Sequence, residues 1–542
     1  MKLTILSLLT LAADTVVGQE AKLPKPDPLT VRTATGTFTG LIDPQFPNTR
    51  QFRAIPFAKP PVLSRRWLPP ETLSPSNEHR NTTQFPPSCP QFVSAVPMYY
   101  SSDFTRGNTI YNPNSNGDQN DTSGLVGTAT SEDCLYLAVW APQVKTAPQP
   151  KAGLPVLFFM TGGGFGIGGI DIPWQMPPSW VERSQSHIVV TINYRLTIFG
   201  FPYARGLSNG QQNLGILDQR AALEWVRDNI AAFGGDPSRI TQMGRSAGAV
   251  STDIHAYAFH EDPIAQAHYM QSGTIFGASI LPKDSTFSNF TFVARNFGCE
   301  NPDGDKDGAA QLECMRRVSF KDIINFIGQY GDRGETPALR FALVPDDRIV
   351  FTNYRERAEA GNIARLPVMF SIAANEASAG FWQPNITTSP DQSIITALDV
   401  KSFVCPAFNS TVYRNRMGSD VPVFRFQHAG TFPNLNYYPW LGAYHASDIP
   451  IFFGTYHLLD HVANTTQFEI DVSRSMQDHV LAFLKDPYNG PQKTMGWKPM
   501  IASDPNGGDL IRFGAYGVVS QHVDGVEVDG VCQGLGEYDP FP

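Results

Sequence analysis

The stretch QMGRSAGAV contains a serine in the pattern G-x-S-x-G, written here as Gly244-Arg245-Ser246-Ala247-Gly248. A serine hydroxyl on a sharp turn between a strand and a helix can attack the carbonyl carbon of an ester, provided that a base takes its proton. Such a turn brings strand and helix close together and therefore needs small neighbours, which Gly244, Ala247 and Gly248 are. The pattern predicts that Ser246 is a nucleophile, although a glycine-serine turn without chemistry has the same letters.

A run of glycines earlier in the chain can supply the hydrogen-bond donors that ester hydrolysis needs. In Gly162-Gly163-Gly164-Phe165, which follows an apolar run, backbone N–H groups can point at the oxygen that gains negative charge. Together with the N–H of Ala247 they would form an oxyanion hole with three donors. A flexible glycine loop is the alternative, and the downstream serine pattern disfavours it. Phe165 is a candidate substrate contact.

The proton relay needs an acid and a base, which follow the serine in the order Asp or Glu, then His, in sites of this kind. Glu376 comes just after the apolar run LPVMFSI, where an acid at a strand end is expected, whereas Asp346 and Asp347 lack so clear a strand before them. Two histidines are candidates for the base. His428 lies directly at the end of a predicted strand, and His445 lies in the loop-like segment GAYHASDIP. Spacing alone does not choose between them.

Strands and helices must position these residues, and the surrounding sequence predicts an alternation of the two. The apolar runs LPVLFFM, HIVVTINYR, RITQMG, LPVMFSI and VPVFRFQ are typical of buried strands in a mostly parallel sheet. LGILDQRAALEWVRDNIAAF places its apolar residues on one helical face and stops at Gly234-Gly235, which predicts a crossover helix. AGAVSTDIHAYAF can open a helix directly after Ser246. The predicted class is α/β, with helices flanking a large sheet and with long insertions.

The chain has 542 residues, 42% of them hydrophobic and 17% charged, which is ordinary for a folded globular protein. Its net charge of −9 and pI near 5.7 argue against nucleic acid as a partner. The start, MKLTILSLLTLAADTVVG, has an apolar run too short to span a bilayer, followed by small residues, and predicts a signal peptide over residues 1–18. Because no later apolar run is long enough for a transmembrane segment, we expect a secreted chain.

Cysteines and glycosylation sequons agree with a secretory compartment. Six cysteines, an even number, are consistent with disulfides, but their number does not decide the pairing. The sequence contains neither a C-x-x-C pair nor a His-Cys cluster, so we expect no zinc. The six cysteines are Cys89, Cys134, Cys299, Cys314, Cys405 and Cys532. The six N-x-[ST] sequons, candidates for glycosylation on surface loops, are Asn81, Asn120, Asn289, Asn385, Asn409 and Asn464.

Ordered motifs along nearly the whole mature chain make the sequence similar to the type-B carboxylesterase and lipase family, which contains cholinesterases and secreted fungal lipases. The segment FRAIPFAKPP resembles the family's F-x-G-I-P-Y-A-x-P-P. Further similar motifs are SEDCLYLAVW, GGGF, NLGILDQRAALEWVRDNIAAFGGDPSRIT, the serine turn, NEAS and GAYHASDIPIFFGT. The resemblance implies an α/β-hydrolase fold, one domain over residues 19–542, a small ester as substrate, and no metal or organic cofactor.

Carried over position by position, the resemblance also implies the roles of individual residues. It implies Ser246 as nucleophile, Glu376 as acid and His445 as base, and so favours His445 over His428. The implied oxyanion donors are the N–H groups of Gly163, Gly164 and Ala247. The implied disulfides are Cys89–Cys134 and Cys299–Cys314, which leaves Cys405 and Cys532 as a third pair.

The sequence departs from the family pattern at four positions. Ala138, Gln242 and Ala377 replace an asparagine, an apolar residue and a glycine, respectively, and we expect them to adjust packing. Arg245 stands where the family most often has glutamate, in a position that faces the active-site gorge. A positive charge there disfavours cationic choline esters. We expect Arg245 to bind either an anionic or strongly polar substrate or a carboxylate of the gorge wall.

The resulting expectation is a secreted serine carboxylesterase that hydrolyses a modest-sized ester or lactone through an acyl-enzyme, with fungal secondary metabolism as a possible setting. A triacylglycerol lipase is an alternative, but the long segment 90–133 is polar where a lipase lid is expected to be apolar. A recognition module that has lost catalysis is disfavoured because all three triad residues are present. Acyl transfer or rearrangement in place of hydrolysis stays open.

Overall fold

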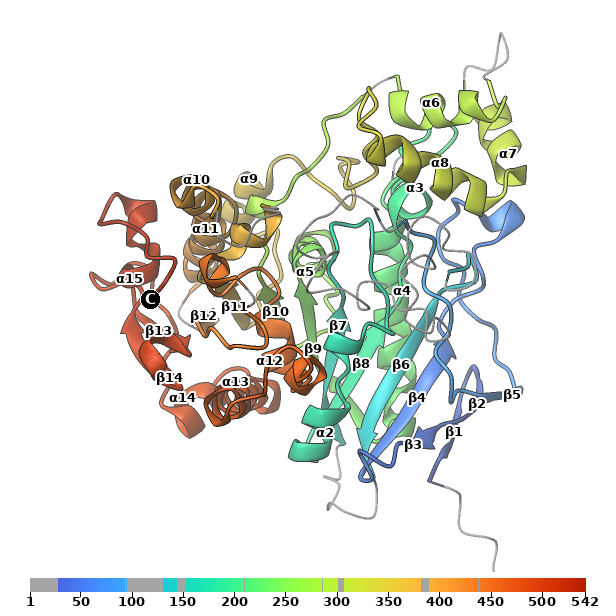
Figure 1. Cartoon of the computed structure of the whole chain (residues 1–542). Helices are drawn as coiled ribbons and strands as arrows, with labels where there is room; N and C mark the ends of the chain where they lie inside the picture. Colours follow the sequence, from blue (N-terminus) through green and yellow to red (C-terminus); the bar gives the residue numbers. More distant parts are fainter. Residues whose placement is uncertain are drawn as a thin grey trace, which may run out of the picture.

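A sheet of eleven strands, in the order β14-β13-β12-β11-β10-β9-β7-β8-β6-β4-β3, is the central layer of the computed structural model (Figure 1). Neighbouring strands are parallel from β13 to β8 in this order and antiparallel at both ends of the sheet. Its strands are β3 (Leu41–Ile42), β4 (Thr49–Pro56), β6 (Tyr136–Pro142), β7 (Leu154–Met160), β8 (Ile188–Ile192), β9 (Gly235–Arg245), β10 (Ala267–Gln271), β11 (Val368–Ala373), β12 (Val423–His428), β13 (Asp509–Phe513) and β14 (Ser520–Asp524). A separate sheet consists of β1 (Thr30–Thr33), β2 (Gly36–Thr39) and β5 (His79–Asn81).

The structure describes residues 28–92, 94, 130–143, 153–208, 210–284, 286–300, 307–381, 389–418, 420–436 and 438–542. The predicted signal peptide, the sequons at Asn120 and Asn385, and most of the predicted lid segment 90–133 lie outside these residues. No helix among the residues described has both the length and the apolar composition of a membrane span.

Helices cover both faces of the sheet, which explains why the central strands are apolar throughout instead of alternating. In β7, Val156, Phe158 and Met160 belong to one buried cluster, together with α4, while Leu157 and Phe159 belong to a second one, together with α12 and α13. The helices are α2 (Pro178–Ser184), α3 (Thr197–Gly200), α4 (Leu214–Asn229), α5 (Ala247–Ala258), α6 (Ser288–Asn296), α7 (Ala309–Arg317), α8 (Phe320–Asp332), α9 (Tyr354–Glu359), α10 (Gln392–Asp399), α11 (Cys405–Asn415), α12 (Asp448–Phe453), α13 (Gln467–Lys485), α14 (Gly490–Met495) and α15 (Val526–Asp529).

The predicted α/β class is confirmed, and the predicted elements have close counterparts. The five apolar runs correspond to β7, β8, β9, β11 and β12, and the predicted crossover helix is α4. This helix continues as a short 3-10 turn over Ile230–Phe233, after which Gly234 adopts a positive φ of 97° and the chain enters β9. Glycine is favoured at such a position because it has no Cβ to clash with the backbone.

Three disulfides cross-link the described residues. They join the pairs Cys89–Cys134, Cys299–Cys314 and Cys405–Cys532, with S–S distances of 2.00, 2.02 and 2.01 Å. The first two are the pairs that the resemblance implies, and the third joins the two cysteines that these pairs leave. The third bond links the start of α11 to the C-terminal region of the chain.

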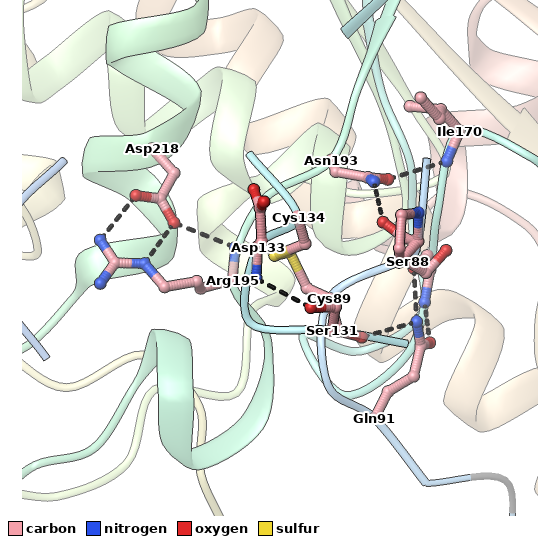
Figure 2. The surroundings of a disulfide bond; sticks show 12 residues. Ser88, Cys89, Gln91, Ser131, Asp133, Cys134, Ile170, Asn193, Arg195 and Asp218 are labelled. Atoms are coloured by element: carbon pink, nitrogen blue, oxygen red, sulfur yellow. Dashed lines mark hydrogen bonds and ion pairs between the residues drawn. A yellow bond between two sulfur atoms is a disulfide. The ribbon is translucent and has the colours of Figure 1, made fainter. Parts of the chain in front are cut away.

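The Cys89–Cys134 disulfide lies beside the loop that follows β7 (Figure 2). Two residues after Cys89, the Gln91 side chain donates a hydrogen bond to the carbonyl oxygen of Gly168 (2.9 Å) and accepts one from its N–H (2.7 Å). Gln91 is fully buried. A segment held by a disulfide therefore fixes the far end of the loop that contains the glycine run.

A buried ion pair attaches the segment after β8 to α4. Arg195 donates from Nε and Nη2 to the two carboxylate oxygens of Asp218, at 2.8 and 2.7 Å, and its backbone N–H donates to the same carboxylate at 3.0 Å. Both side chains are buried. In a bidentate ion pair of this kind, the hydrogen bonds compensate for the loss of hydration of each charge.

Replacing Asp218 with Asn tests this pair, because it leaves the Arg195 guanidinium buried without a countercharge. We expect the free energy of unfolding to fall by about 3–5 kcal/mol. The measurement is urea denaturation under oxidising conditions, followed by tryptophan fluorescence.

Asp262→Asn is the matched control, because Asp262 also pairs with an arginine of α4, Arg220 (2.6 Å), but is exposed. Its loss is expected to stay within about 1 kcal/mol. Equal losses in the two variants would contradict the importance of the buried pair.

Candidate active site

Ser246 occupies a strained turn between the end of β9 and the start of α5. Its backbone has φ 54° and ψ −119°, a conformation that residues other than glycine rarely adopt. The turn is possible because the residues two positions before and after Ser246 are glycines: a Cβ on Gly244 would lie 1.9 Å from the carbonyl oxygen of Gly248, and one on Gly248 would lie 2.2 Å from that of Met160. Both glycines of the G-x-S-x-G pattern are therefore required by packing.

Hydrogen bonds connect Ser246, His445 and Glu376 into one chain. His445 Nε2 lies 2.9 Å from Ser246 Oγ, and His445 Nδ1 lies 2.5 Å from Glu376 Oε2. The other oxygen of Glu376 accepts from the backbone N–H of Ala373 (2.7 Å), at the end of β11. With Glu376 ionised, Nδ1 of His445 carries the ring proton, and Nε2 accepts a hydrogen bond from the Ser246 hydroxyl. This is the tautomer that a general base requires.

The surroundings of His445 favour its neutral form. Burial lowers the pKa of His445, the charge of Arg245 lowers it further, and the Glu376 carboxylate acts in the opposite direction. The net pKa lies below the ordinary value of 6.5. A neutral imidazole is the form that can take a proton from the serine.

The rival acids and the rival base lie elsewhere. His428 is buried at the end of β12, where burial lowers its pKa to about 3, and neither ring nitrogen has a hydrogen-bond partner among the residues described. Asp346 accepts hydrogen bonds from the backbone N–H groups of residues 348 to 350 and from Asn213, so it organises a loop. Asp347 pairs with Lys283 on the surface. None of the three contacts Ser246.

The glycine run lies next to the serine turn. A Cβ on Gly162 would lie 2.7 Å from the carbonyl oxygen of Arg245 and 2.9 Å from the Cβ of Ser246, so this glycine allows the two loops to touch. Gly163 and Gly164 both have positive φ, 118° and 62°, and the Gly163 carbonyl accepts from the N–H of residues 166 and 167. The loop is thus a defined turn beside Ser246.

A cavity of about 440 Å³ opens at Ser246. Its wall includes Ser246, Gly164 and Ala247, together with three aromatic rings from distant parts of the chain. The rings are Phe165, Phe341 and Phe403. A cavity of this size accommodates a small or medium-sized acyl group.

Phe403 was not singled out from the sequence. It lies in a π-helical turn, Val400–Val404, between α10 and α11, and its ring centre lies 5.2 Å from that of His445. Irregular turns of this kind are frequent at functional sites. The sequence around Phe403 shows no pattern that distinguishes it from an ordinary amphipathic helix.

A buried aspartic acid, Asp399, supports the turn that carries Glu376. Asp399 Oδ1 accepts from the backbone N–H of Ala377 (2.6 Å), the residue after Glu376. Burial, together with the nearby Glu376 carboxylate, raises the pKa of Asp399 to about 8. Asp399 thus stays protonated at neutral pH and adds no second negative charge next to Glu376.

The remaining predicted residues are distributed over the surface and the core. Asn81, Asn409 and Asn464 are exposed, and Asn289 is half-buried with its amide donating to the carbonyl oxygen of Arg340 (2.8 Å). Gln242 is buried in β9 and donates to the sulfur of Met160 at 3.8 Å. Ala138 is buried in β6.

Arg245 is 9% exposed, and its side chain forms no ion pair with any residue that the structure describes. Its Nε and Nη2 atoms are buried without a partner in that part of the chain. It is also absent from the wall of the cavity at Ser246.

Comparisons with known proteins show the family to which the chain belongs. Residues 27–399 match the model of the carboxylesterase family. The chain is 36% identical to a chlorogenic acid esterase of Aspergillus niger over 93% of this chain and 94% of that protein. It is 34% identical to secreted lipase 5 of Gibberella zeae over 96% and 95% of the two chains, and 27% identical to an acetylcholinesterase of Bungarus fasciatus over 88% and 82%. The chain therefore belongs to the carboxylesterase family and is a carboxylic ester hydrolase.

Proposed function

We propose that the protein hydrolyses its ester through an acyl-enzyme on Ser246, with His445 as base, Glu376 as acid, and the N–H groups of Gly163, Gly164 and Ala247 as oxyanion donors. The observation that supports this most directly is the hydrogen-bond chain from Ser246 through His445 to Glu376. This series of hydrogen bonds ends at Ser246, which lies in the wall of a cavity that Gly164 and Ala247 also line.

In the first half of the reaction, Ser246 Oγ bonds to the ester carbonyl carbon while its proton moves to His445 Nε2. Negative charge on the carbonyl oxygen is stabilised by the backbone N–H groups. The C–O bond to the alcohol then breaks, and the alcohol leaves with the proton from His445. In the second half, a water molecule gives a proton to His445 Nε2 while its oxygen bonds to the acyl carbon. The bond between the acyl carbon and Ser246 Oγ then breaks, Oγ takes the proton back from His445, and the acid leaves.

The proposed substrates are modest-sized esters with an aromatic acyl group. The cavity wall contains three aromatic rings, those of Phe165, Phe341 and Phe403, against which a planar acyl group can pack. Aromatic rings generally pack favourably against one another in buried sites. A relative with high coverage is named a chlorogenic acid esterase, which also points to an aromatic acid ester.

A triacylglycerol lipase is the second candidate, because another relative with high coverage is a secreted lipase. Acyl transfer is the third, and it would be recognised by an acylated acceptor in place of the free acid.

We further propose that residues 1–18 direct secretion, that residues 19–542 form one domain, and that the exposed sequons are glycosylated. The three disulfides and the relative that is named a secreted lipase support secretion of the protein.

Ser246→Ala tests the proposed nucleophile. We expect kcat/KM for a simple p-nitrophenyl ester to fall by at least about 10⁴-fold, and covalent labelling by a fluorophosphonate to disappear, because no other hydroxyl lies on the relay. Labelling is followed by mass spectrometry of the modified peptide. Ser238→Ala, on the same strand but far from His445, is the control and should be labelled like the unmodified enzyme. Full labelling of Ser246→Ala would place the nucleophile elsewhere.

The pH dependence tests the proposed base. Since His445 must be neutral to accept a proton and its pKa is lowered, kcat/KM should be fully present above this pKa and lost as pH falls through it. We expect the midpoint of this loss below pH 6.5, the ordinary histidine value. The measurement is kcat/KM for a neutral ester between about pH 4 and 8, where histidines titrate. A midpoint above the ordinary value would contradict the geometry of His445.

Phe403→Leu tests the aromatic acyl site. We expect kcat/KM for a methyl hydroxycinnamate to fall by about 3- to 10-fold, because a ring–ring contact contributes about 0.5–1.5 kcal/mol beyond burial. Hydrolysis of methyl acetate by the same variant is the control, since an acetyl group has no aromatic ring to form a ring–ring contact with Phe403. Equal losses on both esters would mean that Phe403 acts only through His445. A parallel series of fatty acyl esters that favoured long chains would support the lipase instead.

A further inference from the structure

Three buried polar side chains near the proposed triad, those of Arg245, Gln271 and Asp448, are absent from the wall of the cavity at Ser246. Arg245 ends β9 and is paired in register with Gln271, which ends β10. Gln271 Nε2 donates to Asp448 Oδ2 (2.6 Å), and Asp448 begins α12, three residues after His445. The group therefore connects the strand that carries Ser246 with the segment that carries His445.

Each of the three side chains has polar atoms without a partner among the described residues. The donors are Nε and Nη2 of Arg245, and the acceptors are Oε1 of Gln271 and Oδ1 of Asp448. Gln271 and Asp448 are completely buried. Since an isolated buried charge is unfavourable, a cation and an anion in one such cluster compensate each other even without direct contact.

The charges around His445 come from few groups. Glu376, in the turn after β11, is hydrogen-bonded to His445; Arg245, at the end of β9, is close enough for its charge to act on His445; and the Phe403 turn presents an uncharged ring. Asp399 and Asp448 both lie close enough to Glu376 for its charge to act on them. Burial and Glu376 raise the pKa of Asp448 to about 7, while Arg245 lowers it.

We propose that Arg245 is a positioning residue for the reaction, which, supported by Gln271 and Asp448, keeps the His445 imidazole uncharged in mildly acidic surroundings. This inference rests on the proposed role of His445 as the base. An arginine repels a proton on the neighbouring imidazole, whereas a glutamate at the same place would attract it. The protein would thus stay active at lower pH than a relative with glutamate before the serine.

This role differs from binding an anionic substrate. Arg245 does not line the cavity at Ser246, and its Nε and Nη2 atoms are buried. A substrate-binding arginine would change KM for charged esters. An arginine that acts on His445 changes the pH range for every ester, including neutral ones.

The test measures the pH dependence of kcat/KM for a neutral ester, and of Ser246 labelling by a neutral fluorophosphonate, in two variants without the charge, R245Q and R245M. We expect the acidic midpoint to rise by about one pH unit in both, because a nearby charge shifts a pKa by about that amount. R245K keeps the charge and should retain the original midpoint. The two neutral variants differ in polarity, so the result can be taken from whichever one folds.

Two further variants separate electrostatics from structure. R239Q removes a positive charge from the same strand, where Arg239 pairs with Asp236, and should leave the midpoint unchanged. D448N keeps Arg245 and makes position 448 permanently neutral; since the pKa of Asp448 is about 7, its carboxyl is already largely protonated at the acidic midpoint, so the midpoint should lie at or slightly below that of the unmodified enzyme. Thermal unfolding of each variant shows whether it is folded.

The inference is overturned if the neutral Arg245 variants and the unmodified enzyme share one midpoint, or if D448N raises the midpoint as R245Q does. If the unmodified enzyme shows neither labelling of Ser246 nor an acidic midpoint, the proposed function itself has failed. The two failures are therefore distinguishable.

Discussion

The structure depends on the close contact of three backbone segments at Ser246. The end of β9, the start of α5 and the loop after β7 approach so closely that glycine is required at 162, 244 and 248. This contact forces Ser246 into its strained conformation and brings the glycine run beside the hydroxyl. A strained residue persists only where the surrounding structure determines it, and here the parallel strands on both sides of β9 supply that constraint.

A second principle is the placement of charged and titratable groups in the buried interior. Behind Ser246 the chain buries Glu376, Asp399, Asp448 and Arg245 within one small volume. Four full charges there would be unfavourable, and the pKa values of Asp399 and Asp448 are raised so that each carries a proton over part of the neutral range. Glu376, the proposed acid, accepts hydrogen bonds from both His445 and a backbone N–H.

The framework around this site is held by connections between distant segments. Gln91, next to the first disulfide, fixes the loop of the glycine run, and the Arg195–Asp218 pair attaches the neighbouring loop to α4. The third disulfide holds the start of α11 directly after the turn that carries Phe403. Rigid loops are needed because oxyanion donors act only when they are already in place.

The sequence by itself determined the strands, the crossover helix, the serine turn and the glycine run, because apolar periodicity and glycine placement are local properties. Spacing did not choose between His445 and His428. Only the tertiary structure brings His445 to Ser246, because the loop after β12 folds back across the strand ends. Phe403, Asp399, Gln271 and Asp448 had no local signal either. The proposed roles of these four residues depend on which side chains they contact in the buried interior. Those contacts are decided by the packing of segments that are far apart in the chain.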